Sequence, residues 1–353
     1  MSITRSIHPL PGEAEHTARL SRLIDAFGGR RVVVIGDIIA DEFIYGQIAR
    51  VSREAPVLIL RYDSTQVVAG GAGNAANNVA ALGGRAGLVG LVGPDEIGRR
   101  LTSSLHRLVE RGGMLRPSGC GTPTKTRILA GGIHSAKQQI VRIDREPGVS
   151  LDARTRQDLG RRVMAAVSGA DAVIVSDYGY GLVSPALAAD VRQALDKRSR
   201  RRRVPILVDS RYELLGYRGL AACTPNESEV EQLLGIRIND DLRVLERAGR
   251  AILKRTRMQA VLVTRGSRGM ALFQPGVRTV HLPIYGSDEI ADVTGAGDTV
   301  IATMALGLAC GGSFDEAARL ANYAGGLVVM KRGTATVTAD ELRAAVIGEH
   351  AAP

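Results

Sequence analysis

Short runs of β-branched residues that alternate with helical stretches constrain the fold of this chain more than any other feature. Residues 172–176, 205–209, 221–224 and 260–264 are apolar runs separated by stretches with helical spacing. This alternation predicts parallel strands joined by crossover helices. Earlier runs at 31–35 and 86–92 have the same character. We therefore expect an α/β fold: a doubly wound, mostly parallel sheet with helices on both faces.

Other segments alternate in polarity instead. Residues 124–129 and 138–143, separated by Gly131 and Gly132, predict a hairpin with one exposed face. Residues 43–48, 57–62 and 66–68 predict further short strands. Together they predict a small β-sheet lid, with strands from about 43–68 and 124–144.

The chain divides into three expected parts. Residues 1–30 form an N-terminal extension whose second half has helical spacing, 31–345 form the main domain, and 346–353 form a C-terminal tail.

The net charge of +10 does not indicate a nucleic-acid partner. Only five of the 46 basic residues are Lys, so the excess is an Arg bias spread over the chain. The one dense basic run, 197–203, lies where a solvated loop is expected. Aromatic residues make up 3% of the chain and Trp is absent, which argues against base stacking. A positive field also suits an anionic, phosphorylated substrate.

The cysteines and the apolar stretches predict a cytoplasmic protein. Cys120, Cys223 and Cys310 are odd in number and widely spaced, which is typical of reduced thiols. The longest apolar stretch, 300–310, is too short to span a bilayer. The N-terminal residues lack the apolar region of a signal peptide. We therefore expect no membrane partner.

The strongest chemical signal is the segment 292–298 (DVTGAGD), which precedes the helical run 300–310. Its small residues allow a tight turn whose N–H groups, with the helix dipole, can hold a phosphoryl group. Asp298 at the end of this loop can take the proton from a sugar hydroxyl. The alternative is a plain helix N-terminus at which Asp298 interacts with the dipole.

Two N-terminal segments offer groups for a hydroxyl-rich ligand. Gly70 and Gly71 lead through a tight turn to Asn74, at the start of a predicted helix. Asp37 and Asp41 follow the first strand and can accept hydrogen bonds from hydroxyls. The alternatives are a simple turn at the glycines and a surface bend capped by Asp37.

Two later segments offer groups for a nucleotide. Asn226 follows a strand and can cap the next helix, and Glu229 lies three residues later. That pair can also reach a Mg²⁺–phosphate cluster through water. The segment 264–269 (TRGSRG) predicts either a β-hairpin turn or a glycine-lined nucleotide edge.

Five segments in this order resemble those of the ribokinase (PfkB-type) family of carbohydrate kinases. DVTGAGD is that family's most specific signature and GGAGN (70–74) is its N-terminal one. The resemblance covers residues 31 to 345 and implies a ribokinase-like fold and phosphoryl transfer from ATP to a sugar hydroxyl. It also implies that Asp298 is the catalytic base and that Gly295, Ala296 and Gly297 form the anion hole.

The same resemblance implies a nucleotide site and a metal. Mg²⁺ would be held through water by Asn226 and Glu229. The implied ATP-binding residues are Asn226, Glu227, Ser228, Glu229, Thr264, Gly266, Gly269 and Asn322.

Within the family, the chain most resembles the D-glycero-β-D-manno-heptose 7-phosphate kinases. The segments 52–57, 124–127, 138–144, 176–178 and 333–337 carry this resemblance. It implies phosphorylation of O1 of the heptose phosphate for ADP-heptose biosynthesis. The implied substrate-binding residues are Asp37, Asp41, Gly70, Gly71, Asn74, Lys125, Arg127 and Arg142, of which the three cations suit the 7-phosphate.

Two positions depart from the family pattern. Tyr180 stands where the family has Lys in Asp-Tyr-x-Lys-Gly, and Arg211 stands where the family has the Lys of Asp-Pro-Lys. Arg keeps the charge with a different geometry, whereas Tyr does not keep it.

Other functions of the same fold remain alternatives: 1-phosphofructokinase, ribokinase or fructokinase activity, or a non-catalytic sugar or nucleotide sensor. The family also implies a homodimer. The sequence has no His-x-Gly-His motif, so we expect a separate adenylyltransferase.

Overall fold

A computed structural model describes residues 11–131, 137–146, 152–198, 203–286 and 292–348. It contains a nine-stranded sheet in the order β13-β12-β11-β10-β9-β8-β1-β4-β5. Only β12 runs against its neighbours in this sheet. The predicted doubly wound, mostly parallel sheet is confirmed. Its strands are β1 (Arg31–Gly36), β4 (Arg85–Leu91), β5 (Val109–Leu115), β8 (Ala172–Asp177), β9 (Ile206–Ser210), β10 (Ala222–Cys223), β11 (Ala260–Thr264), β12 (Met270–Phe273) and β13 (Val280–Leu282).

Both faces of this sheet are covered, because its strands are apolar on both sides. In β1, Val32 and Val34 join one hydrophobic core, whereas Val33 and Ile35 join the other. The first core holds side chains of α1 (Pro11–Asp25), α2 (Ala72–Ala81), α3 (Glu96–Ser103), α8 (Ala296–Ala309), α9 (Phe314–Val329) and α10 (Ala339–Gly348). The second holds those of α4 (Ala153–Val167), α5 (Pro185–Arg198), α6 (Glu227–Leu234) and α7 (Leu242–Thr256).

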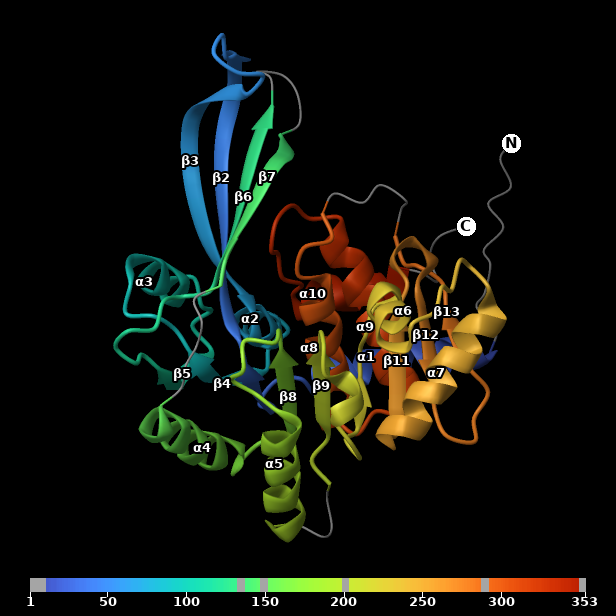
Figure 1. Ribbon diagram of the computed structural model, residues 1–353. Coiled ribbons are helices and arrows are strands. Elements are labelled where there is room, and N and C mark those ends of the chain that lie inside the picture. Colours follow the sequence, from blue (N-terminus) through green and yellow to red (C-terminus); the bar gives the residue numbers. More distant parts are fainter. Residues whose placement is uncertain (1–10, 132–136, 147–151, 199–202, 287–291, 349–353) are drawn as a thin grey trace, which may run out of the picture.

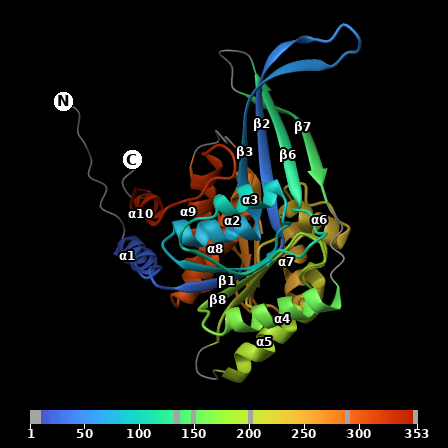
Figure 2. The same ribbon diagram turned by 90° about the vertical axis from the view of Figure 1, so that its left-hand side faces the viewer.

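A second sheet of four strands projects from the main body (Figures 1 and 2). Its order is β3-β2-β6-β7, where β2 is Ile38–Val51, β3 is Leu58–Gly71, β6 is Thr124–Gly131 and β7 is Gln138–Arg145. The predicted antiparallel hairpin of β6 and β7 is confirmed. The two short strands predicted at 57–62 and 66–68 are parts of one strand, because β3 stays paired with β2 past the polar residues between them, with a register shift between Tyr45 and Gly46.

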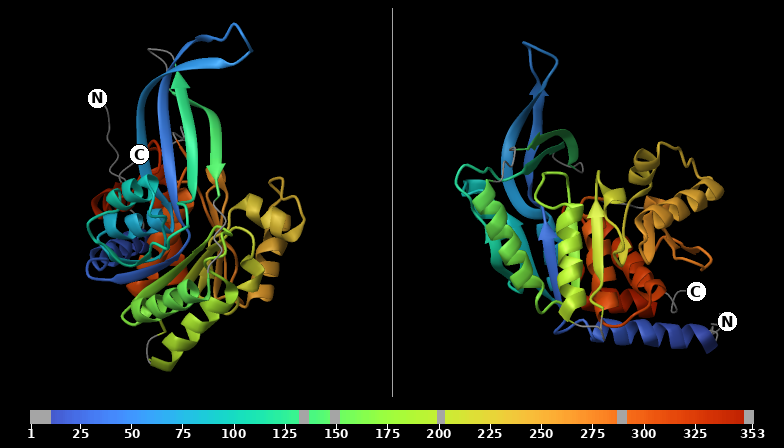
Figure 3. Two further views of the ribbon diagram at one scale, coloured as in Figure 1. Left: turned by 60° about the vertical axis from the view of Figure 1, so that its left-hand side comes forward. Right: turned by 60° about the horizontal axis from the view of Figure 1, so that its bottom comes forward.

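The first and last described helices, α1 and α10, pack against each other. Figure 3 shows α1, in blue, next to the red C-terminal part of the chain. Leu20, Leu23 and Phe27 are buried although they fall in the expected N-terminal extension. Helix α10 continues to Gly348, past the expected end of the main domain at residue 345. Within the described segments, no helix has the length and apolarity that crossing a membrane requires.

Candidate active site

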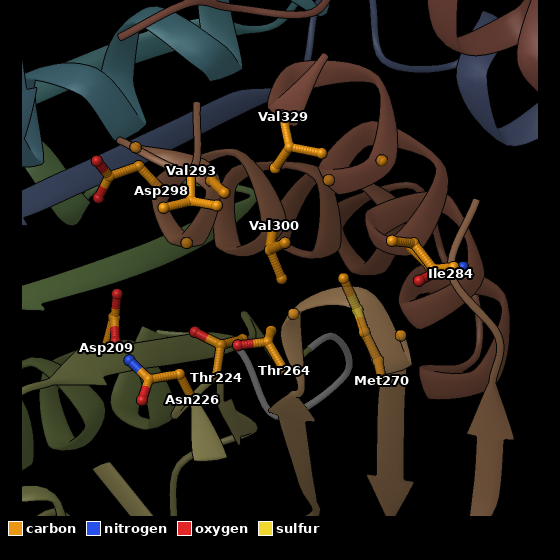
Figure 4. Close-up of a pocket in the computed structure, with 18 of the residues that line it drawn as sticks. Asp209, Thr224, Asn226, Thr264, Met270, Ile284, Val293, Asp298, Val300 and Val329 are labelled. Carbon is orange, nitrogen blue, oxygen red and sulfur yellow. The ribbon is translucent and has the colours of Figure 1, made fainter. Parts of the chain in front are cut away.

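A cavity of about 460 Å³ lies where β8 to β11 end and α8 begins. Figure 4 shows that one end is polar, with Asp298 opposite Asp209 and Asn226. The other end is apolar and is formed by side chains such as Met270 and Ile284. This position, beyond the carboxyl ends of parallel strands, is where ligands bind in open α/β sheets.

Gly295 caps the N-terminus of α8 with φ +80° and ψ 4°. A Cβ atom there would lie 2.5 Å from Nδ2 of Asn74. Only glycine adopts this positive φ without strain and also leaves room for the Asn74 side chain. Ala296 uses its N–H in the turn, donating to the carbonyl of Val293 at 3.2 Å. Within the described chain, the N–H groups of Gly297 and Asp298 have no protein acceptor. These two groups, rather than that of Ala296, are available to an anion.

Asp298 is buried and oriented by the GGAGN helix. Asn74 Nδ2 donates to Oδ2 of Asp298 at 2.9 Å and to the carbonyl of Gly295 at 3.3 Å. Asn78 Nδ2 donates to Oδ1 of Asn74 at 3.1 Å, and the hydroxyl of Thr299 donates to Oδ1 of Asn78 at 2.9 Å. The predicted residue Asn74 therefore contacts the carboxylate itself, through a buried network that joins α2 to α8.

Burial raises the pKa of Asp298 to about 7. The hydrogen bond from Asn74 lowers this pKa, and the nearby charge of Asp41 raises it. The Tyr178 hydroxyl, 3.4 Å from Oδ1, and the charge of Lys125 also lower it. A carboxylate whose pKa lies near neutrality can both accept and release a proton at neutral pH.

The predicted acids and glycines of the N-terminal segments meet next to this carboxylate. Asp37 is buried and accepts from the N–H of Tyr178 at 2.8 Å, while burial raises its pKa to about 6. Asp41 is also buried, and a Cβ on Gly70 would lie 2.3 Å from its Oδ2. Gly71 has φ +55° and a Cβ there would meet the carbonyl of Asp37 at 2.6 Å.

The predicted cations lie on one face of the second sheet. The strand register places Lys125 between Asp41 and Asp144, and Arg127 opposite Arg142. These partners share a face because side chains paired across a ladder point the same way. Arg127 forms a part-buried ion pair with Asp41 at 2.5 Å.

The remaining two cations differ in their partners. Arg142, part-exposed, pairs with Asp144 at 2.6 Å. Lys125 is 8% exposed, and its ammonium lies 4.6 Å from the ring centroid of Tyr178. No described residue forms an ion pair or hydrogen bond with it. Burial, and the nearby charge of Arg211, lower the pKa of Lys125.

Most of the predicted nucleotide residues line the cavity. Asn226 and Glu229 form a capping box, with both hydrogen bonds at 2.9 Å, so the helix-capping interpretation is also correct. Glu227 is turned to Arg268 at 2.7 Å, and Ser228 is exposed; neither lines the cavity. The other predicted residues in its lining are Thr264, Gly266, Gly269 and Asn322.

Two carboxylates, Asp209 and Glu229, line the polar end of the cavity. Burial raises the pKa of each, and the charges of Glu229 and Asp298 raise that of Asp209 further. A cation between them would relieve this repulsion. Among the residues described, no three His, Cys, Asp or Glu side chains gather into a metal site. The donors therefore suit an ion that keeps most of its waters, as Mg²⁺ does.

Sequence reasoning assigned no specific role to Asp209 or Tyr178, although both lie in the cavity wall. Their position at the ends of the predicted strands 172–176 and 205–209 could have identified them as candidate site residues. The departures at Tyr180 and Arg211 lie nearby. The Tyr180 hydroxyl is 3.5 Å from Glu146, and Arg211 lies over the ring of Tyr212 at 5.7 Å.

The chain is similar to known proteins over most of its length. A model described as pfkB family carbohydrate kinase matches residues 30–341. The bifunctional protein HldE of Trichlorobacter lovleyi is 40% identical over 322 residues, which are 91% of this chain and 63% of that protein. HldE of Methylococcus capsulatus is 40% identical over 331 residues, 93% of this chain and 66% of that protein. The chain thus spans about two thirds of the length of these relatives.

Solved structures share the fold at low sequence identity. Arabidopsis thaliana ribokinase complexed with ribose and ATP has a TM-score of 0.69 at 22% identity, covering 92% of this chain and 100% of that one. Escherichia coli phosphofructokinase-2 in complex with fructose-6-phosphate has a TM-score of 0.70 at 20% identity, covering 91% and 99%. The expected ribokinase-like fold is confirmed.

Proposed function

The chain belongs to the pfkB family of carbohydrate kinases, phosphotransferases with an alcohol acceptor, and we propose that it phosphorylates O1 of D-glycero-β-D-manno-heptose 7-phosphate with ATP. The observation that carries the proposal is the position of Asp298. This buried carboxylate lines the cavity, and Asp41 and Lys125 lie close enough for their charges to shift its pKa. A base in that position faces a nucleotide on one side and a sugar on the other.

The chemistry assigned to the chain's own residues is proton transfer and charge stabilisation. Asp298 takes the proton from the attacking hydroxyl, and its pKa of about 7 leaves a useful fraction ionised at neutral pH. The free N–H groups of Gly297 and Asp298, at the start of α8, receive the negative charge of the phosphoryl group. The phosphates of ATP lie at the polar end of the cavity and the base of the nucleotide at its apolar end.

Mg²⁺ fits the polar end through water, near Asp209, Asn226 and Glu229, and when bound it neutralises charge on the phosphates. Asn226 Oδ1 and one Glu229 oxygen are already used in the capping box. Contact through water needs only their remaining acceptor capacity.

An anionic acceptor is favoured by the charged face of the second sheet. Lys125 is buried, and although Asp41 and Asp144 flank it in the strand register, its ammonium forms no direct ion pair with a described side chain. A phosphate on the sugar would supply a direct partner. The 40% identity to two HldE proteins supports a heptose phosphate as this acceptor.

The test is a panel of acceptors assayed for ADP release at fixed ATP and Mg²⁺. Heptose 7-phosphate is compared with heptose, fructose 6-phosphate, fructose and ribose, and phosphorus NMR locates the new phosphate. We expect the highest kcat/KM for heptose 7-phosphate and a product phosphorylated at O1. A higher kcat/KM for an uncharged hexose or pentose would reject the heptose assignment and leave the kinase class in place.

We also propose that the chain forms a homodimer through the second sheet. The face opposite Lys125 carries Val141 and Ile143, which are 46% and 45% exposed. Apolar side chains on an exposed strand favour association with another copy. Sedimentation of the wild type and of Ile143→Glu tests this: we expect a dimer that the variant shifts to monomer, and a monomeric wild type would reject the proposal.

A further inference from the structure

Tyr178 contacts both sides of the candidate site. It directly follows β8, and its N–H donates to Oδ2 of Asp37 at 2.8 Å, which fixes its backbone. Its ring packs against Gly71, because a Cβ atom on Gly71 would lie 3.2 Å from Cε2 of Tyr178. The glycine therefore leaves room for the tyrosine between the main sheet and the second sheet.

The hydroxyl of Tyr178 reaches the base. It lies 3.4 Å from Oδ1 of Asp298, whereas Asn74 donates to Oδ2 at 2.9 Å. The two carboxylate oxygens are therefore held differently: Oδ2 has a short bond to a buried amide, and Oδ1 has a long bond to a hydroxyl. The loosely held oxygen has a lone pair left for a proton from the acceptor.

The ring of Tyr178 holds the cation. The ammonium of Lys125 lies 4.6 Å from the ring centroid, within the range of a cation–π interaction. This ammonium is nearly buried and forms no direct ion pair with a described residue, so the ring face is a direct contact that helps to place it. One aromatic side chain thus contacts Asp298 at its edge and Lys125 at its face.

We propose that Tyr178 is a positioning residue that sets the distance between the base and the cation that binds the acceptor's anionic group. This proposal deepens the proposed function and rests on it. It assigns separate parts of the side chain to separate tasks. The hydroxyl orients Oδ1 of Asp298, and the ring places Lys125.

The groups that face Asp298 come from several elements: Asn74 of α2, Asp41 of β2, Lys125 of β6, Tyr178 after β8 and Asp209 of β9. Of these, Tyr178 alone among the described side chains contacts both Asp298 and Lys125 directly. A tyrosine that only filled space would be replaced by Phe without effect on the base.

Two variants separate the two tasks. Tyr178→Phe keeps the ring and removes the hydroxyl. We expect KM for the sugar phosphate to stay within about twofold. The acid limb of the kcat/KM profile should move up by about half a pH unit or more, because the carboxylate loses one donor. Tyr178→Leu should show the same shift and also raise that KM about fivefold to tenfold, because Lys125 loses its ring.

Tyr212→Phe is the matched control, since Tyr212 is an exposed tyrosine on the neighbouring loop. We expect wild-type kinetics from it. An unshifted acid limb in Tyr178→Phe, or an unchanged sugar KM in Tyr178→Leu, would overturn the proposal. If the Leu variant does not fold, Tyr178→Met takes its place, because an unbranched side chain fills an irregular space without offering a ring face. The same pH shift and the same rise in KM are expected from it.

A measurement without substrate keeps this test distinct from that of the kinase assignment. The Phe variant raises the folded-state pKa of Asp298, so its loss of unfolding free energy relative to wild type must be small near pH 5 and grow as pH rises through 7. A pH-independent difference would overturn the contact between Tyr178 and the base. If the wild type is inactive on heptose 7-phosphate but its unfolding free energy differs from that of the Phe variant in a pH-dependent way, the proposed substrate is rejected. The contact between Tyr178 and Asp298 then still stands.

Discussion

The main sheet and the second sheet meet at the same site but are built differently. The central strands of the main sheet contribute to cores on both faces, and these cores hold the ends of β8 to β11 in place. In the second sheet, β7 is exposed along its whole length, and none of the helices that the structure describes covers it. The proposed base, Asp298, and the cavity belong to the main body, and the cations proposed to bind the acceptor belong to the second sheet. We therefore expect substitutions in the first region to change the rate of transfer and substitutions in the second to change acceptor binding.

The largest effect should follow from Asp298→Asn. The amide keeps the size and the contact with Asn74 but cannot take a proton. We expect kcat to fall about 10²- to 10⁴-fold, with KM for ATP nearly unchanged, in a steady-state ADP-release assay. A variant with wild-type kcat would show that Asp298 is not the base.

A smaller effect is expected from Lys125→Met on the second sheet. Loss of a buried charge-assisted contact should raise KM for an anionic sugar about 10- to 100-fold and leave KM for ATP unchanged. Arg142→Met is the paired control, because Arg142 is part-exposed and already neutralised by Asp144. If the two substitutions raise KM for the anionic sugar equally, Lys125 has no role in acceptor binding that Arg142 lacks.

Gly295→Ala tests the loop that begins α8. The new Cβ would lie 2.5 Å from Asn74 Nδ2 at a φ of +80°. We therefore expect a loss of about 1–2 kcal/mol in unfolding free energy and a roughly tenfold lower kcat. Gly297→Ala is the comparison, since its Cβ would lie 3.8 Å from Asp209 Oδ2. Chemical denaturation and kinetics of the two variants should rank Gly295→Ala as the more damaging.

The last prediction concerns how the free energy of unfolding depends on pH. The folded pKa of Asp298, about 7, lies above the ordinary value of 3.8. The folded chain therefore binds more protons than the unfolded chain between these values, and stability falls as pH rises through them. Asp298→Asn lacks this loss. We expect the free energy of unfolding of this variant to exceed that of wild type by about 1–3 kcal/mol at pH 8 and to lie closer to it near pH 4. Urea titrations at both pH values measure this. A constant difference would show that the Asp298 pKa is not raised.

The sequence predicted β1, β4, β8, β9, β10 and β11 of the main sheet because these buried strands are short, apolar and bounded by polar residues, but it predicted no strand at β5 or β13. It predicted the second sheet less well, since the polar residues between 62 and 66 suggested a break where β3 is one strand with a register shift in its pairing with β2. The residue types at 292–298 indicated a tight loop at the start of a helix, whereas the role of Asp298 as the base rests on the family resemblance and stays a prediction.

Charge neutralisation could not be predicted in the same way. Arg127 and Arg142 looked equivalent to Lys125. The register places Asp41 and Asp144 beside Lys125, but the side chains of Arg127 and Arg142 form the direct ion pairs with these acids. Tyr178 and Asp209 acquire their neighbours from the order of the strands in the sheet. Pairing of strands distant in the chain decides which side chains meet, and a linear pattern does not contain that order.

The buried network of Asn74, Asn78 and Thr299 ties the environment of Asp298 to a segment more than two hundred residues earlier. Recombination between two relatives would separate these halves of the site even if every motif survived intact. A chimera joined between them inherits its carboxylate from one parent and the amides that orient it from the other. Compatibility across that junction, more than overall similarity of the parents, should decide which chimeras are active.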